Sequence, residues 1–291
     1  MATLVYDFGG TAIKLGLFEG EELKLHTQFP TPSTFEECQA LLMKSITKYE
    51  QEYGIEGIAL SMPGAVDTKT GIIGGASAIP YIHNFEWYPF FQEILPVPVS
   101  MNNDANCSAL GEVYYGSATG SQDVLFIVIG TGIGGAIVKA GQIHSGVHLH
   151  GGEFGYMIHN RETMQIWSEQ ASTHALIKRI QRLNPTIQTG EQVFEFAKEN
   201  QEISAEVAAW YHDLALGIYN LQYSFDPECI VIAGGVSEQA EFQTHLEQAI
   251  TQILDHVGIA TVVPTIKVAA NGNRSNLYGA YAYHQQVHHL M

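Results

Sequence analysis

A module that occurs twice constrains the fold more than any other feature of the sequence. Each copy consists of a buried strand, a glycine-rich turn that contains threonine, and a second strand. The copies lie at residues 4–18, with the turn at 9–11, and at residues 124–139, with the turn at 130–132. Short apolar runs that end at glycines indicate buried strands. Two copies of one unit predict two lobes that begin alike, and 291 residues agree with two domains of roughly 150 residues each.

The remaining patterns predict strands and helices in alternation. Ser33 and Glu36 form a capping-box signature for a helix that should end at Gly54. Apolar residues at helical spacing predict one helix from Trp167 to about Leu183 and another around residues 207–221. Buried strands are expected at 57–61, 97–101, 229–233 and 265–268, and further helices at 105–114, at 193–198 and from Ser275 to the end of the chain.

The charge balance and the cysteines limit the classes of partner and compartment. The chain has 13 Lys and Arg against 30 Asp and Glu, a formal net charge of −17, which argues against nucleic acid or an anionic membrane as a partner. Cys38, Cys107 and Cys229 lie far apart and form no CxxC motif, so a reducing compartment is expected. No signal-peptide pattern or membrane-length apolar run is visible, and we therefore expect a cytoplasmic protein.

One carboxylate among amides follows the predicted strand at 97–101. Asp104 lies in the Asn-Asn-Asp-Ala-Asn segment at 102–106. A carboxylate at the mouth of a sheet can accept a proton from a substrate hydroxyl, and Asn103 can both donate to and accept from neighbouring hydroxyls. This arrangement is typical of a sugar-handling site. The alternative is that Asp104 caps the helix that follows, since Asp and Asn are preferred N-caps.

The glycine turns suggest contact with phosphate. Glycines allow the backbone to approach a phosphate closely and to point its N–H groups at it. Neither turn is a Walker motif, and the turn at 130–135 leads to a strand rather than to a helix, which is unlike a dinucleotide fingerprint. Asp7 at the end of the first strand can orient Mg²⁺ or its waters, because Mg²⁺ favours one or two carboxylates together with substrate phosphates.

Taken together, these motifs resemble those of the ROK family of sugar kinases and repressors. The motifs that carry the resemblance lie, in order, at 7–16, 63–67, 103–106, 130–135 and 151–155. The resemblance implies an α/β fold of the two-lobed, actin-like ATPase type (hexokinase, Hsp70, actin) with a central cleft. We expect a small N-terminal lobe from 1–115 plus 270–291, which includes the C-terminal helix, and a large C-terminal lobe from 116–269.

The resemblance also implies roles for single residues. Asp104 would be the general base that accepts the proton of the sugar's 6-hydroxyl as this oxygen attacks the γ-phosphate of ATP. The residues expected to contact the sugar are Gly64, Ala65, Asn103, Asp104, Glu153, Tyr156 and Ser168. Those expected to contact the nucleotide or its Mg²⁺ are Asp7, Gly9, Gly10, Thr11, Lys14, Gly130, Thr131, Gly132, Gly234 and Gly235. The expected activity is ATP-dependent phosphorylation of the 6-hydroxyl of a hexose or β-glucoside.

Two departures from the family pattern affect the sugar end of the site. Family members commonly bind zinc through a His and three closely spaced cysteines, but Tyr156 replaces the His and no cysteine lies between Cys107 and Cys229. We therefore predict no structural zinc. A family Glu that often contacts the sugar corresponds to Ser168, with Glu169 one residue later, although Ser168 can also be read as a helix N-cap. Both departures leave room for a β-glucoside or another modified hexose.

Other functions remain open at this stage. A repressor is disfavoured because no winged helix can precede a strand that begins near Leu4. A sugar-binding regulatory protein without catalysis, an N-acylmannosamine kinase and a polyphosphate-dependent kinase are alternatives. The resemblance is compatible with a homodimer, but the sequence identifies no contact surface.

Two further groups of residues have no assigned role. The aromatic residues Phe85, Trp87, Tyr88, Phe90 and Phe91 form either core or an exposed patch or lid. The C-terminal histidines are interpreted as a solvated helix end; they are His284, His288 and His289.

Overall fold

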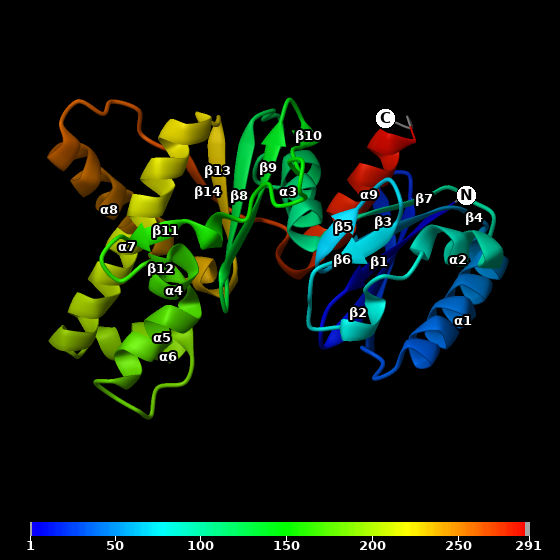
Figure 1. Ribbon diagram of the computed structural model, residues 1–291, viewed down its shortest axis with the longest axis horizontal. Helices are drawn as coiled ribbons and strands as arrows, with labels where there is room; N and C mark the ends of the chain where they lie inside the picture. The colour runs from blue at the N-terminus through cyan, green and yellow to red at the C-terminus, as the bar shows by residue number, and fades with distance from the viewer. Residues whose placement is uncertain (1, 289–291) are drawn as a thin grey trace. The chain divides into compact units, whose positions relative to one another are not determined.

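The computed structural model describes residues 2–288 and divides into two compact units (Figure 1). Unit 1 consists of the described residues of Met1–Gly116, Ser145–His150 and Asn273–Met291. Unit 2 consists of Ser117–His144 and Gly151–Gly272. Relative to the division expected from the sequence, unit 1 also includes Ser145–His150.

Unit 1 is built on a five-stranded sheet of order β3-β2-β1-β4-β7. Its strands are β1 (Ala2–Phe8), β2 (Ala12–Glu19), β3 (Glu22–Pro30), β4 (Ile55–Met62) and β7 (Val99–Asn103), and β5 (Ala65–Asp67) and β6 (Ile72–Gly74) form a separate hairpin. β1 is antiparallel to β2 and parallel to β4, which is parallel to β7. The central strands β1 and β4 are almost entirely buried, as expected for parallel strands covered on both faces.

Four helices cover the sheet of unit 1. They are α1 (Phe35–Tyr53), α2 (Trp87–Ile94), α3 (Asp104–Tyr115) and α9 (Ser275–Val287). Residues of α1 and α2, such as Leu42 and Trp87, share one core with Leu4 and Tyr6 of β1. Residues of α3 and α9 form a second cluster with Val5, which points to the opposite face of β1. The two helix pairs therefore lie on opposite faces of the sheet (Figure 1).

Unit 2 contains a second five-stranded sheet, of order β10-β9-β8-β13-β14. Its strands are β8 (Val124–Ile129), β9 (Ile133–Lys139), β10 (Gln142–Ile143), β13 (Cys229–Ala233) and β14 (Ile266–Val268), and β11 (Ile158–Asn160) and β12 (Gln165–Ile166) form a hairpin. Its helices are α4 (Trp167–Ala171), α5 (Thr173–Gln181), α6 (Gly190–Ala197), α7 (Gln201–Phe225) and α8 (Phe242–Val257). Leu125, Ile127 and Ile129 of β8 pack into one core with these helices.

Two predicted helix starts differ in detail from the structure. The N-cap of α1 is Thr34, whose side chain accepts a hydrogen bond from the Glu37 N–H, and the Glu37 carboxylate accepts from the Ser33 N–H. The N-cap thus lies one residue later than Ser33, and the reciprocal bond of a capping box is not formed, because the Glu37 carboxylate bonds Ser33 rather than the N–H of Thr34. The helix predicted from Trp167 to about Leu183 is two helices, because Ser172 is extended and its hydroxyl accepts from the Ala175 N–H.

The two residue groups without an assigned role belong to unit 1. Trp87 and Phe91 are fully buried, so the aromatic run is mainly core. The reading of the C-terminal histidines as solvated is wrong for His284, which is buried with its Nδ1 2.9 Å from the Ser100 hydroxyl. Burial lowers the pKa of His284 to about 4. His289 lies outside the described residues. Within 2–288, no helix is long and apolar enough to cross a bilayer.

Candidate active site

The parallel strands of unit 1 bring the predicted sugar-binding residues to one edge of the sheet. β1, β4 and β7 are neighbours, so their carboxyl ends meet, and loops at such ends usually hold the ligands of α/β sheets. Asp7 lies at the end of β1, Gly64 just beyond β4, and Asn103 at the end of β7. The amide Nδ2 of Asn103 donates to the Gly64 carbonyl over 3.0 Å, which fixes the two loops to each other.

Asn103, rather than Asp104, caps helix α3. The Asn103 side-chain oxygen accepts from the N–H groups of Ala105 and Asn106 at 2.9 and 3.3 Å. Asp104 is the first residue of the helix, and its Oδ1 also accepts from the Ala105 N–H. The alternative that Asp104 serves as the N-cap is therefore not what the structure shows.

The surroundings of Asp104 raise the pKa of its carboxyl group toward neutrality. Burial, which penalises the charged carboxylate, raises its pKa to about 6, and the nearby negative charge of Asp7 acts in the same direction. The hydrogen bond from the Ala105 N–H opposes this shift. A carboxyl group with a pKa near neutrality is suited to accept a proton from a hydroxyl and release it afterwards.

Three protein groups contact the carboxylate of Asp7. Its Oδ1 accepts from the Ser61 hydroxyl and from Asn276 Nδ2, both at 2.8 Å, and its Oδ2 lies 3.1 Å from the Lys14 ammonium. Lys14 also donates to the Asn273 carbonyl. These three contacts leave one acceptor site of the carboxylate open on Oδ2. The role of Asp7 toward Mg²⁺, direct or through metal-bound waters, stays a prediction.

The first glycine turn presents open backbone at the same edge. Gly10 and Thr11 are exposed, while Gly9 donates to the Ala12 carbonyl and thereby closes the turn. A side chain at Gly10 would come within 2.8 Å of the Ala78 methyl group. Glycine at this position therefore keeps the segment around Ala78 close to the turn.

In unit 2 the second glycine turn and the turn after β13 are adjacent for the same topological reason. β8 and β13 are parallel neighbours, so the turns that follow Ile129 and Ala233 meet. A Cβ at Gly234, where φ is 107°, would lie 2.1 Å from the Ile129 carbonyl oxygen, so only glycine permits this approach. Gly234 itself thus packs the two turns together.

A cavity of about 600 Å³ lies over these two turns. Its lining includes Gly130, Thr131, Gly235 and residues at the starts of α5 and α6. The His174 N–H at the start of α5 donates to the Gly130 carbonyl, so the positive end of the helix dipole is next to the glycine turn. The cavity brings together three of the predicted nucleotide residues; Gly132 and Gly234 do not line it.

Three other residues predicted to contact the sugar lie around a short 3₁₀ turn, Phe154–Tyr156. They are Glu153, Tyr156 and Ser168. Glu153 precedes the turn and is exposed, and Tyr156 is 67% exposed. Ser168 is not a helix N-cap; its hydroxyl accepts from the Ile133 N–H at 2.9 Å. Glu169 instead bonds the Ile166 N–H at the start of its own helix. Because a Cβ at Gly155 would lie 2.2 Å from the Ser168 oxygen, the Glu153 and Ser168 segments are in direct contact.

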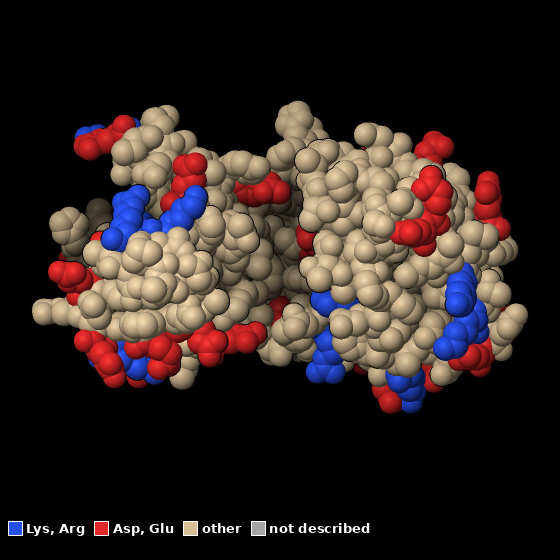
Figure 2. Space-filling model, turned by 90° about the horizontal axis from the view of Figure 1, so that it is seen from below, with Lys and Arg blue, Asp and Glu red and all other residues tan. Residues whose placement is uncertain are grey.

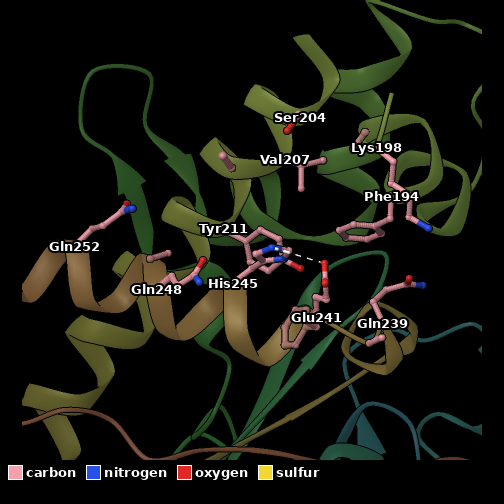
Figure 3. Close-up of a pocket in the computed structure, with 15 residues that line it drawn as sticks. Phe194, Lys198, Ser204, Val207, Tyr211, Gln239, Glu241, His245, Gln248 and Gln252 are labelled. Atoms are coloured by element: carbon pink, nitrogen blue, oxygen red, sulfur yellow. Dashed lines mark ion pairs between the residues drawn. The ribbon is translucent and has the colours of Figure 1, made fainter. Parts of the chain in front are cut away.

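A second cavity of unit 2, of about 570 Å³, lies between α6, α7 and α8 (Figure 3). Phe194, Tyr211 and Phe242 contribute aromatic walls, and His245 forms an ion pair with Glu241 at 4.0 Å. None of the predicted site residues lines it.

Sequence reasoning did not identify the partners of Asp7 or the wall of the nucleotide cavity. Ser61 lies opposite Asp7 in the parallel register of β1 and β4, which only the strand pairing reveals. Asn276 is distant in sequence and carries no motif. His174 follows a helix break that its apolar spacing does not show. Among residues 2–288, no group of three or more His, Cys, Asp or Glu is arranged to hold a metal ion.

Comparison with known proteins finds sugar kinases that are similar to this chain over nearly its full length. It is 32% identical to a β-glucoside kinase of Klebsiella pneumoniae, over 99% of this chain and 97% of that protein. It is 27% identical to an N-acetyl-D-glucosamine kinase of Haemophilus influenzae, over 95% of this chain and 97% of the relative. A ROK family protein from Streptococcus pneumoniae, solved in complex with sucrose, superposes with a TM-score of 0.94 at 33% identity, over 100% of both chains.

These similarities confirm the expected α/β fold class of the actin-like ATPases. The model of the ROK family matches residues 3–287, which is nearly the full length of the sequence. The chain therefore belongs to the ROK family.

Proposed function

We propose that this protein is an ATP-dependent sugar kinase that phosphorylates the 6-hydroxyl of a hexose or β-glucoside. The observation that carries the proposal is the placement of Asp104, a carboxyl group with a pKa raised to about 6, at the carboxyl edge of the unit 1 sheet. The kinase activity agrees with the relatives that cover almost the whole chain. A β-glucoside kinase is among them, which favours a glycoside substrate.

The residues of the chain supply positioning and proton transfer. Asp104 accepts the proton of the 6-hydroxyl as the sugar oxygen attacks the terminal phosphate, and Asn103 and the Gly64–Ala65 backbone hold other hydroxyls. Phosphoryl transfer needs alignment and charge neutralisation more than covalent chemistry from the protein. Asp7 holds Lys14 and Asn276 in place beside the glycine turn at Gly9–Thr11.

The nucleotide occupies the 600 Å³ cavity of unit 2 in this proposal. The backbone at Gly130 and Thr131 and the start of α5 face the phosphates, and Gly235 lies against the adenosine. The net charge of −17 repels ATP as a whole, so local N–H groups must attract it. Mg²⁺ supplies charge neutralisation on the phosphates, and the structure offers it no protein cage within residues 2–288.

Several finer statements remain proposals of the same kind. Tyr156 in place of a zinc-ligating His supports a fold without structural zinc. The sugar is the expected partner, nucleic acid is not, and a homodimer and a cytoplasmic location remain predictions.

The test is ATP consumption in the presence of Mg²⁺. The panel contains glucose, mannose, fructose, N-acetylglucosamine, N-acetylmannosamine, cellobiose and gentiobiose, and each sugar is assayed with the wild type, Asp104→Asn and the exposed control Asp255→Asn. Turnover that is lost only in Asp104→Asn supports the proposal. Turnover confined to the N-acetylated sugars would identify an N-acylhexosamine kinase. Sugar binding without turnover on any member would indicate the regulatory, non-catalytic protein.

A further inference from the structure

A further cavity of unit 2, of about 800 Å³, begins at Ser168 and lies among β12, α4, α5 and α7. Thr131 and His174 line both this cavity and the nucleotide cavity, so the two are adjacent. Ser168 is in contact with the Gly152–Gly155 element that carries Glu153. Ser168 therefore lies between the cavity and the part of unit 2 assigned to the sugar, and the inference that follows rests on the proposed kinase function.

The charges lining the cavity are balanced. Three cationic side chains, Lys178, Arg179 and Arg182, are matched by three carboxylates, Glu169, Glu206 and Asp213. Two of the six are already engaged with each other, since Arg179 forms an ion pair with Asp213. The wall therefore has no net positive charge that would favour an anionic ligand. A neutral ligand rich in hydroxyls needs donors and acceptors in similar numbers, and the wall offers both.

The side-chain amides of Gln165 and Gln170 add further donors and acceptors to the wall. Gln170 donates to Gln165 Oε1 at 2.6 Å, and Arg179 donates to the Gln170 carbonyl at 2.7 Å, so the wall is held by its own hydrogen bonds. The side chains of Lys178 and Glu206 form no hydrogen bond or ion pair within residues 2–288. They come from facing helices, α5 and α7, and are available to a ligand between them. A rigid wall with a few unengaged polar groups is typical of a small-molecule site.

We propose that this cavity binds the second sugar residue of a disaccharide β-glucoside, with Lys178 and Glu206 as residues that determine the preference for a disaccharide over a monosaccharide. The first sugar residue occupies the site formed with Ser168 and Glu153, and the glycosidic oxygen directs the second residue past Ser168 into the cavity. The small side chain of Ser168 leaves room for the second sugar residue, because a longer side chain at this position would extend from the wall into the cavity.

The test compares Lys178→Ala and Glu206→Ala with the control Lys198→Ala, an exposed lysine of unit 2 that does not line this cavity. Steady-state kinetics are measured with cellobiose, gentiobiose and glucose. Loss of one hydrogen bond to a charged group should lower kcat/KM for a disaccharide roughly tenfold and leave the value for glucose within about twofold. The control should leave all three values unchanged. Substitutions at such surface positions seldom disturb folding.

Equal effects on glucose and on the disaccharides, or no effect on either, would overturn the subsite. Turnover of glucose but not of any disaccharide by the wild type would overturn it too, while leaving the kinase proposal intact. Calorimetric titration with cellobiose and with tripolyphosphate, in the absence of ATP, gives a readout that needs no turnover. Weaker cellobiose binding in the two variants supports the subsite even if the kinase proposal fails. Unchanged cellobiose binding, or loss of tripolyphosphate binding alone, contradicts it.

Discussion

At the scale of single residues, the role of Asp104 as a base and its burial act in opposite directions on its protonation state. A base must be ionised to accept the sugar's proton, but burial favours the protonated carboxyl group and raises its pKa to about 6. We expect Asp104→Asn to lower kcat by about 10²–10⁴-fold, the usual contribution of a positioned base, with little change in KM. Rapid-quench or coupled kinetics at saturating ATP would measure this. An unchanged kcat would remove Asp104 from the chemical step.

The same pKa predicts how activity depends on pH. Because only the ionised carboxylate acts as the base, and the pKa of about 6 belongs to the free protein, kcat/KM for the sugar should rise as the pH increases through about 6 and then level off. A profile of kcat/KM at saturating ATP between pH 5 and pH 8 in the wild type checks this, and the binding of a non-hydrolysable ATP analogue at each pH excludes loss of ATP binding. A flat profile through this range would show that another group limits the rate.

The stability of the protein should depend on pH in the opposite direction. The folded pKa of Asp104 is raised above its unfolded value, so its neutral form contributes fully below the unfolded pKa and this contribution is lost as pH rises through about 6. The shift corresponds to about 3 kcal/mol. Asp104→Asn should therefore be more stable than the wild type at pH 8, and the difference should be much smaller at pH 4. Urea unfolding at both pH values measures it.

At the scale of elements, helices α3 and α9 hold the parts of unit 1 that the site depends on. Their backbones meet at two glycines: a Cβ at Gly279 would lie 1.5 Å from the Cys107 carbonyl oxygen, and one at Gly111 would lie 2.2 Å from the Ser275 carbonyl oxygen. α3 begins at Asp104, and α9 carries Asn276 to Asp7. The crossing therefore couples the packing of two helices to the alignment of the site.

We expect Gly279→Ala to force the two helices apart and to cost at least the upper end of the usual range for overpacking, which is about 1–3 kcal/mol, because the backbone it meets cannot move aside. Thermal unfolding of this variant measures the loss. Gly258→Ala is not a matched control, because φ is positive there. Gly235→Ala, which would have no neighbour within 4 Å, is the better comparison for a glycine at ordinary φ and should retain the wild-type Tm. A normal Tm for Gly279→Ala would contradict the close crossing.

The elements also show which features a sequence reveals. Strands such as β8 and the glycine turns are predictable because apolar runs and turn residues act over a few positions. The break at Ser172 is not, because the apolar spacing continues across it while the backbone turns. The buried state of His284 and the contact of Asn276 with Asp7 depend on residues far apart in the chain, which local patterns do not record.

At the scale of the whole molecule, the net charge of −17 and the distribution of charged side chains determine how ATP can approach the protein. Acidic side chains are spread over the visible faces of both units, and basic ones lie in a few groups (Figure 2). Such a field disfavours the approach of polyanions unless a local feature opposes it. The open backbone of the two glycine turns and the start of α5 are the local features available for ATP. None of them carries a full positive charge.

The metal should therefore control nucleotide binding. A non-hydrolysable ATP analogue with Mg²⁺ at about 100 times its Kd should stabilise the protein by about 2.7 kcal/mol, as mass action requires, and EDTA should remove most of that stabilisation. The increase in Tm measured by differential scanning calorimetry tests this, with the analogue and excess EDTA as the paired condition. Without the metal, the triphosphate charge meets an acidic protein whose local attraction comes from N–H groups and from Lys14, which is already paired with Asp7. An equal increase in Tm in EDTA would show that the backbone alone neutralises the phosphates.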